Sequence, residues 1–128
     1  MSATDVFLLV IAALLIFIYL KKYLTGRSIK NYVAEEIEAK IKNNEIILLD
    51  VRTPKERKGN HIKGSYHIPL YEIKSRVHEL NRFKDKEIVC YCRVGNRSLI
   101  AASKLKKYGF RSANLKGGIV AWKAKKTI

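Results

Sequence analysis

The chain has 128 residues, of which 48% are hydrophobic and 29% charged, and this composition excludes a wholly disordered protein. There are 26 Lys and Arg residues against 11 Asp and Glu residues, so the formal net charge is +15 and anionic partners are favoured: nucleic acid, acidic lipid headgroups or small oxyanions. Only two cysteines are present, which excludes a secreted scaffold held together by several disulfides.

An apolar segment, VFLLVIAALLIFIYL, occupies residues 6–20 without a charge or a helix breaker. It is shorter than the ~18–20 residues that usually span a bilayer, but Lys21 and Lys22 can extend to the headgroups, so that the membrane contact includes residues 6–24. We therefore predict that residues 1–24 are a single-pass membrane anchor. The alternative is a buried helix of a soluble domain, but such a helix normally has a polar face, which this segment lacks.

The charges around this segment predict its orientation. A secretory signal peptide carries its positive charges before the apolar run, whereas here Asp5 comes before it and the lysines follow. Because positive residues remain on the inner side, we place the protein in the cell membrane with its short N-terminus outside and the remaining chain in the cytoplasm. We expect a linker at residues 25–30 and a domain at residues 31–128, whose positive charge then faces the anionic lipids of the cytoplasmic leaflet.

Beyond the linker, short apolar runs alternate with segments of helical periodicity. We predict strands at residues 28–33, 46–49, 65–67, 88–91 and 113–115. We predict helices at residues 33–43, 70–80, 98–108 and 119–126, and a helical turn that begins at Thr53 and Pro54, a favoured N-cap and a favoured first helical residue. This alternation predicts an α/β fold in which helices cover both faces of a parallel sheet.

Ligands of such sheets bind beyond the carboxyl ends of the strands, where two loops lie, one after Asp50 and one from Cys92 to Ser98. The backbone N–H groups of the second loop can point inward as an anion-binding nest, to which the following helix adds its positive end. Gly95 and also Asn96 can adopt the positive φ that so tight a curve needs. A thiol at the base of a nest has a lowered pKa, so the pattern favours a nucleophilic Cys92 over a structural cysteine.

Residues near these loops have structural interpretations beside functional ones. Asp50 could tune the site, but we favour a carboxylate that caps the next turn. Arg52 and Glu56 are spaced for an ion pair across one helical turn. Cys90 could form a disulfide, act as a resolving thiol or bind a metal, and we favour a small buried core residue. A single Cys-x-Cys without a second pair of ligands does not predict a metal site.

Three stretches of the chain together resemble the rhodanese, or thiosulfate sulfurtransferase, family of single-domain proteins. They read LLDVRTPKE at residues 48–56, continued by HIKGS at 61–65 and HIPL at 67–70, then IVCYCRVGNRS at 88–98 and LKGGIVAW at 115–122. The resemblance covers about residues 28–126. One departure is Asn60, which stands where a glycine often precedes the His-Ile pair. The family implies a five-stranded parallel sheet between helices and a cysteine that cycles through a persulfide. We expect no cofactor and no metal.

The resemblance also implies roles for the residues of the second loop. Cys92 matches the family's persulfide-forming cysteine and would be the catalytic residue. Four residues separate Cys92 from Arg97, as in sulfur-transferring members, whereas phosphatase relatives have a loop one residue wider. We expect the loop to bind the oxyanion of a sulfur donor through one or both of its arginines, with Arg97 preferred. The expected substrate-binding residues are Arg93, Val94, Gly95, Asn96, Arg97 and Ser98.

Two classes of function follow from these features. The first is a membrane-anchored sulfurtransferase that takes sulfur from thiosulfate or a persulfide donor and passes it to cyanide, a thiol or an acceptor protein. The second is a non-catalytic rhodanese-like binding module, or a persulfide carrier, held at the anionic membrane surface. Nucleic-acid binding has only the net charge of +15 in its favour, without an aromatic platform or a recognised motif, and we do not predict it.

Overall fold

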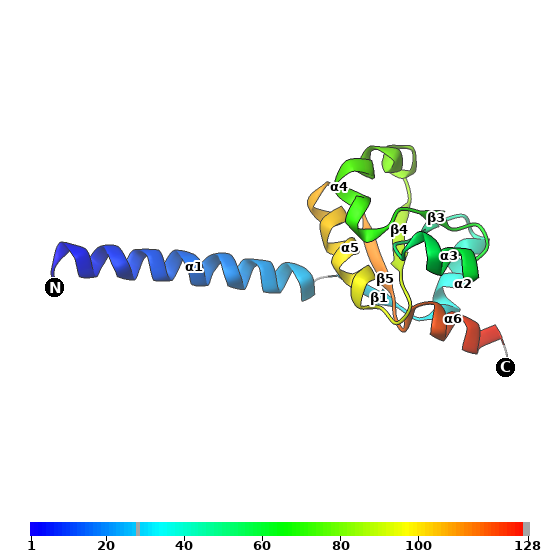
Figure 1. The fold of residues 1–128 in the computed structure, drawn as a ribbon, viewed down its shortest axis with the longest axis horizontal. Helices are drawn as coiled ribbons and strands as arrows, with labels where there is room; N and C mark the ends of the chain where they lie inside the picture. The colour runs from blue at the N-terminus through cyan, green and yellow to red at the C-terminus, as the bar shows by residue number, and fades with distance from the viewer. Residues whose placement is uncertain (28, 127–128) are drawn as a thin grey trace.

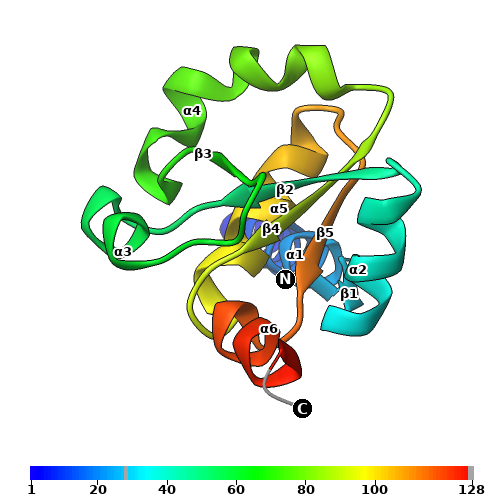
Figure 2. The same cartoon turned by 90° about the vertical axis from the view of Figure 1, so that its right-hand side faces the viewer.

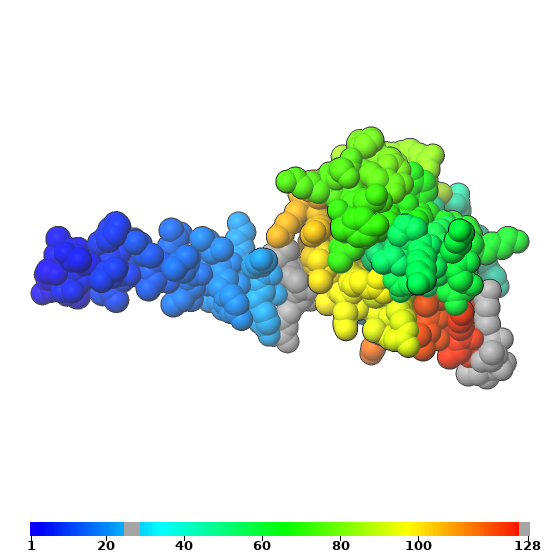
Figure 3. Space-filling view, in the orientation of Figure 1, coloured from blue at the N-terminus to red at the C-terminus, as the bar shows by residue number. Residues whose placement is uncertain are grey.

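A long N-terminal helix, α1 (Ala3–Arg27), extends from one side of an α/β domain in the computed structural model, which describes residues 1–27 and 29–126. The helix is a single rod that stands away from the domain (Figures 1 and 3). Its segment Ala3–Leu24 has a mean hydropathy of 2.6, none of that window is buried, and it is long enough to cross a membrane. The helix continues to Arg27, so the first three residues of the expected linker are helical, while Ser28 lies outside the described residues.

The domain is built on a sheet of five parallel strands, as predicted. The strands are β1 (Lys30–Tyr32), β2 (Ile46–Asp50), β3 (Tyr66–His67), β4 (Glu87–Tyr91) and β5 (Ser112–Leu115). Their order across the sheet is β1-β5-β4-β2-β3. The apolar runs form the neighbouring interior strands β2 and β4, which are covered on both faces, and this position explains why they lack polar alternation.

Two layers of helices cover the sheet (Figure 2). On one face, α2 (Ala34–Lys42) and α6 (Gly118–Lys126) pack with Val89 and Tyr91, and on the other, α4 (Ile73–Arg76) and α5 (Asn96–Lys107) pack with Cys90 and Cys92. The two cysteines therefore lie on the same side of the sheet, because side chains alternate along a strand.

The helix predicted over residues 70–80 is wrong as a single regular helix. The segment consists of a 3₁₀ turn at Leu70–Glu72, the short helix α4 at Ile73–Arg76 and a further 3₁₀ segment at Val77–Phe83. Its apolar pairs, Leu70 with Ile73 and Val77 with Leu80, are each spaced by three residues. This spacing matches the three residues per turn of a 3₁₀ helix, in which such residues lie directly above one another.

The turn predicted at Thr53 is confirmed as the start of α3 (Pro54–Gly59). The Thr53 hydroxyl accepts a hydrogen bond from the Glu56 amide at 3.2 Å, and the Glu56 carboxylate accepts one from the Thr53 amide at 3.2 Å. This reciprocal pair satisfies two amides that the helix itself leaves unbonded.

The carboxyl ends of the strands bring three loops to one edge of the sheet. Asp50 pairs in register with both Tyr91 and His67, so β2, β3 and β4 end at the same level. Cys90 pairs with Asn114, which places the end of β5 and the following Gly117–Gly118 turn beside the loop that begins at Cys92. This is the edge at which the sequence predicted the site.

Candidate active site

Cys92 is the first residue after β4, and its side chain lies at the base of the loop that leads into α5. The Gly95 amide donates a hydrogen bond to Cys92 Sγ at 3.1 Å, and Ser98 Oγ lies 3.3 Å from the same sulfur. Cys92 and Ser98 are both buried, whereas Arg93, Val94 and the first helical residue Asn96 are exposed on the rim of the loop. The structure therefore brings the sequence-predicted loop residues around one sulfur atom.

Hydrogen bonds determine the direction in which the Cys92 pKa moves. Burial alone would raise it, but the Ser98 hydroxyl and the backbone amides of Ser98, Gly95 and Val94 outweigh burial, so the pKa of Cys92 is lowered. Cys90, which is completely buried in the core, has no such donors, and burial raises the pKa of its thiol. The loop thus gives Cys92 a thiol pKa shifted in the opposite direction from that of Cys90, two positions away.

The loop has this shape because the first turn of α6 binds its outer side. The Ile119 amide donates to the Cys92 carbonyl at 2.9 Å, and the Val120 amide donates to the Arg93 carbonyl at 3.2 Å. With the carbonyls turned toward α6, the amides that follow are free to face the sulfur. Gly95 closes the curve with a φ of +116°, which favours glycine over other residues.

Gly118 allows this close approach, a role that the sequence alone did not predict. A Cβ atom at Gly118 would lie 2.4 Å from the Arg93 carbonyl oxygen and 2.5 Å from the Cys92 carbonyl oxygen. The two adjacent glycines were the available signal, since a glycine pair at the start of a helix marks a place where another backbone comes near.

Arg97 is engaged by Glu56 of α3. The Arg97 guanidinium donates two hydrogen bonds to the Glu56 carboxylate, at 2.6 and 2.8 Å. These bonds lower the pKa of Glu56 to about 2 and raise that of Arg97. The ion pair expected between Arg52 and Glu56 is therefore wrong: Glu56 pairs across the site with the loop, and its partner is 41 residues away in the sequence.

Comparison with known proteins shows the family to which the chain belongs. The family model described as "Rhodanese-like domain" matches residues 33–125. The chain belongs to the rhodanese-like family. Among its relatives, a protein of Allochromatium vinosum named "Sulfurtransferase" is 36% identical over 91 residues, which are 70% of this chain and 83% of the relative. The uncharacterized protein YqhL of Bacillus subtilis (strain 168) is 36% identical over 119 residues, which are 92% of this chain and 91% of the relative.

A solved structure shows the same fold. The crystal structure of a rhodanese-related protein from Thermoplasma volcanium has 30% sequence identity and a TM-score of 0.69, and the match covers 75% of this chain and 92% of that one. The rhodanese fold with five parallel strands is thus confirmed, and the sulfurtransferases among the relatives support a role in sulfur transfer in general.

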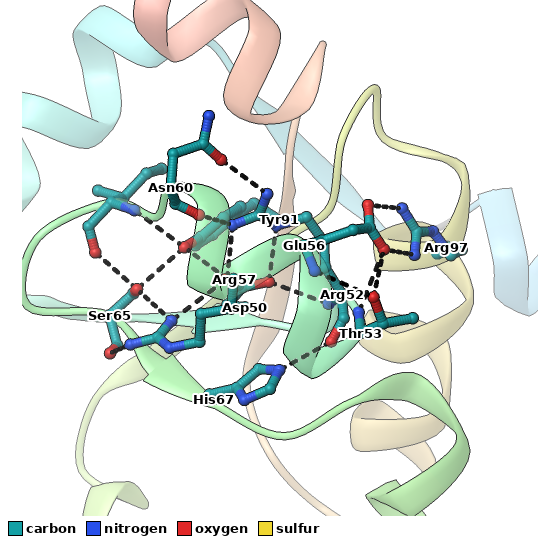
Figure 4. A network of polar contacts seen from close by, with 11 residues as sticks. Asp50, Arg52, Thr53, Glu56, Arg57, Asn60, Ser65, His67, Tyr91 and Arg97 are labelled. Carbon is teal, nitrogen blue, oxygen red and sulfur yellow. Dashed lines mark hydrogen bonds and ion pairs between the residues drawn. The ribbon is translucent and has the colours of Figure 1, made fainter.

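Asp50, at the carboxyl end of β2, lies at the centre of a network of hydrogen bonds and ion pairs (Figure 4). Its carboxylate is fully buried and accepts hydrogen bonds from the Arg52 amide at 2.9 Å, the Arg52 guanidinium at 2.9 and 3.0 Å, Arg57 at 3.2 Å and the Tyr91 hydroxyl at 3.0 Å. Burial alone would raise the pKa of Asp50, but the bonds from Arg52 outweigh it and the pKa is lowered. These contacts fit the structural interpretation, a carboxylate that caps the next turn.

Asn60, the departure from the family's usual glycine, takes part in the same network. The Arg52 guanidinium donates to the Asn60 carbonyl at 2.6 Å and to its side-chain oxygen at 3.2 Å. The backbone of Asn60 is extended, with a φ of −169°, so no glycine is needed there. The substitution therefore adds a partner for Arg52 without straining the loop.

Metal binding has no support in the part of the chain that the structure describes. Within residues 1–27 and 29–126, no three His, Cys, Asp or Glu side chains are grouped so that they could hold an ion. Both cysteines are free thiols.

Proposed function

We propose that this rhodanese-like protein transfers sulfane sulfur through a persulfide on Cys92. The observation that carries the proposal is the hydrogen bond from the Gly95 amide to Cys92 Sγ at 3.1 Å, in a loop that lowers the pKa of Cys92. Amides directed at this sulfur stabilise a thiolate in the resting protein and a negatively charged outer sulfur in the intermediate.

The reaction has two displacement steps at sulfur. The Cys92 thiolate attacks the outer sulfur of thiosulfate, a new S–S bond forms, and the old S–S bond breaks with its electron pair leaving on sulfite. An acceptor thiolate or cyanide then attacks the outer sulfur of the persulfide, and Cys92 leaves as the thiolate. Each step conserves charge, and neither needs a cofactor.

Donor recognition involves the rim of the loop. Arg93 is exposed at the rim, together with Val94 and Asn96, and is available to a donor's sulfonate. Arg97 must first exchange its Glu56 partner for the sulfonate, since both of its bonds to Glu56 are short. We therefore assign the first contact with an oxyanion to Arg93 and the loop amides, and a later contact to Arg97.

Membrane attachment through α1 forms the second part of the proposal. None of the window Ala3–Leu24 is buried against the domain, so a core-helix role leaves its apolar surface in water. The match to YqhL covers 92% of this chain, more than residues 28–128 alone can supply, so it includes part of α1. Lys21 and Lys22 follow the apolar run, which favours a cytoplasmic domain.

The decisive experiment is the intact mass of the full chain in detergent micelles after incubation with thiosulfate. We expect the wild type to gain one sulfur atom, which cyanide removes, and Cys92→Ser to gain none. Cys90→Ala is the matched control, because it removes the other thiol and should still gain the sulfur. No adduct from thiosulfate or from a low-molecular-weight persulfide would favour the alternative, a non-catalytic binding module at the membrane surface.

Attachment is tested on protein expressed in intact cells. We expect the full-length mass in the membrane fraction after alkaline extraction, and digestion of the domain by protease only after the cells are opened. A soluble product that has lost α1 would show that the segment is a cleaved signal sequence and would overturn the anchor.

A further inference from the structure

A chain of hydrogen-bonded side chains leads from Cys92 across the sheet to its edge strand. Ser98 Oγ lies 3.3 Å from Cys92 Sγ and donates to Asn114 Oδ1 at 2.6 Å, and Asn114 Nδ2 donates to Asn31 Oδ1 at 2.8 Å. Ser98 is fully buried and Asn114 is 4% exposed. The strand register places Asn31 opposite Asn114 and Asn114 opposite Cys90, so these side chains share one face of the sheet.

Asn31, at the far end of this hydrogen-bond network, determines which atom donates in each of the other hydrogen bonds. Asn31 Nδ2 donates to the Ile29 carbonyl at 3.4 Å, so Asn31 Oδ1 is the atom that faces Asn114. Asn114 must then present its NH₂ group to Asn31 and its oxygen to Ser98. A serine hydroxyl has one hydrogen, and here Asn114 receives it, so the Ser98 oxygen is left to accept from the Cys92 thiol.

Cys92 occurs in three chemical states, the thiol, the persulfide and the bare thiolate, and they differ in whether the sulfur attracts the hydrogen of the Ser98 hydroxyl. The thiol donates to Ser98 and fits the network as it stands. The persulfide also fits, because its charge is on the outer sulfur and Sγ is neutral. The bare thiolate, in contrast, attracts the Ser98 hydrogen and must compete with Asn114 for it.

We propose that Asn114 is a positioning residue that withholds the Ser98 hydroxyl hydrogen from the Cys92 sulfur and so disfavours the bare thiolate relative to the thiol and the persulfide. The loop amides and the Ser98 hydroxyl both lower the pKa of Cys92, and Asn114 limits the contribution of the hydroxyl by competing for its hydrogen. The comparison of the thiolate with the persulfide, which we call the persulfide half of the inference, rests on the proposed function. The comparison of the thiolate with the thiol does not. Arg97 and Cys90 are titratable groups that also interact with Cys92, and the variants below leave both unchanged.

Two substitutions should release the Ser98 hydrogen in different ways. Asn114→Leu removes the acceptor at similar volume, and Asn31→Ala, at an exposed site, removes the group that fixes the Asn114 orientation. We expect each to lower the pKa of Cys92, by about half to one pH unit for Asn114→Leu and by less for Asn31→Ala. The pKa is read in the full chain, in micelles, from the pH dependence of alkylation by iodoacetamide, with the adduct located on Cys92 by peptide mass.

The background variant Ser98→Ala separates positioning from a general structural effect. In that background neither substitution should shift the pKa, since there is no hydroxyl hydrogen to release. Ser103→Ala is the matched control, because Ser103 lies on the same helix and bonds to the Leu99 carbonyl at 3.0 Å. Equal shifts with and without Ser98, or no shift from either substitution, would overturn the inference, and Asn31→Ala decides it if Asn114→Leu does not fold.

The persulfide half has its own readout. At a fixed ratio of thiosulfate to sulfite, Asn114→Leu should lower the ratio of persulfide to thiolate about three- to tenfold, measured by intact mass. An unchanged ratio would overturn this half alone. If even the wild type forms no persulfide, the proposed function fails, while the alkylation result still decides the role of Asn114.

Discussion

Gly118→Ala tests whether the first turn of α6 shapes the loop around Cys92. The added Cβ atom would lie 2.4 Å from the Arg93 carbonyl oxygen and 2.5 Å from the Cys92 carbonyl oxygen. Both contacts are with backbone, which cannot rotate away as a side chain would. The two hydrogen bonds from α6 to these same carbonyls must therefore lengthen or break, and the N–H groups of the loop no longer point at the Cys92 sulfur.

The expected cost combines three contributions. A non-glycine residue at a φ of +59° costs about 1–2 kcal/mol, overpacking against backbone about 1–3 kcal/mol, and the two weakened hydrogen bonds about 1 kcal/mol each, so we expect about 4–7 kcal/mol in total. Gly109→Ala is the matched control. Gly109 also has a positive φ, +91°, but a Cβ there meets nothing within 4 Å, so only the backbone cost of about 1–2 kcal/mol should appear.

The assay uses the only tryptophan of the chain, Trp122, which is buried on α6 and reports unfolding by urea through its fluorescence. Gly118→Ala should lower the free energy of unfolding more than Gly109→Ala does. In conditions where Gly118→Ala is still folded, it should also slow persulfide formation on Cys92, which Gly109→Ala should not. Equal destabilisation of the two variants, with equal persulfide rates, would refute the idea that α6 holds the loop in shape.

Three further substitutions test other parts of the site. Glu56→Gln should destabilise the domain by about 1 kcal/mol near pH 7, because it loses the partly exposed pair with Arg97. The Glu56 pKa is depressed from 4.5 to about 2, so this stability is present above pH 4.5 and the difference from wild type should vanish as the pH falls through about 2; a constant difference would contradict the assignment. Asp50→Asn should cost about 3–5 kcal/mol in urea unfolding, since it leaves buried arginine charge uncompensated, and a cost near zero would show that the network is dispensable. Cys90→Ala should cost about 1–2 kcal/mol from a small cavity and leave persulfide formation intact, whereas loss of the adduct would make Cys90 part of the chemistry.

Local patterns of the sequence were sufficient to predict most of the fold. The run at Ile46–Leu49 ends in a charge, and the one at Ile88–Tyr91 in the Cys92 loop, so each specifies a buried strand and its carboxyl end within a few residues. The segment 70–80 was not predictable in the same way. Its apolar spacing fits an α-helix and a 3₁₀ helix alike, and only packing against the sheet decides between them.

The candidate site also has a part that the sequence predicted and a part that it did not. The nest around Cys92 lies within seven consecutive residues, so a glycine, a following helix and a cysteine were enough to predict it. The pair between Glu56 and Arg97 joins residues 41 positions apart, and no local pattern specifies such a partner. Arg52 stood nearer to Glu56 in the sequence, but the buried Asp50 carboxylate binds it instead.

The Glu56 pair changes which groups stabilise charge at Cys92. An arginine paired with a carboxylate contributes little net positive charge to the sulfur nearby, so the thiolate depends mainly on the loop amides. In the resting protein Arg97 thus leaves the stabilisation of charge on the sulfur to the loop amides, and it becomes available to an oxyanion only when Glu56 is displaced.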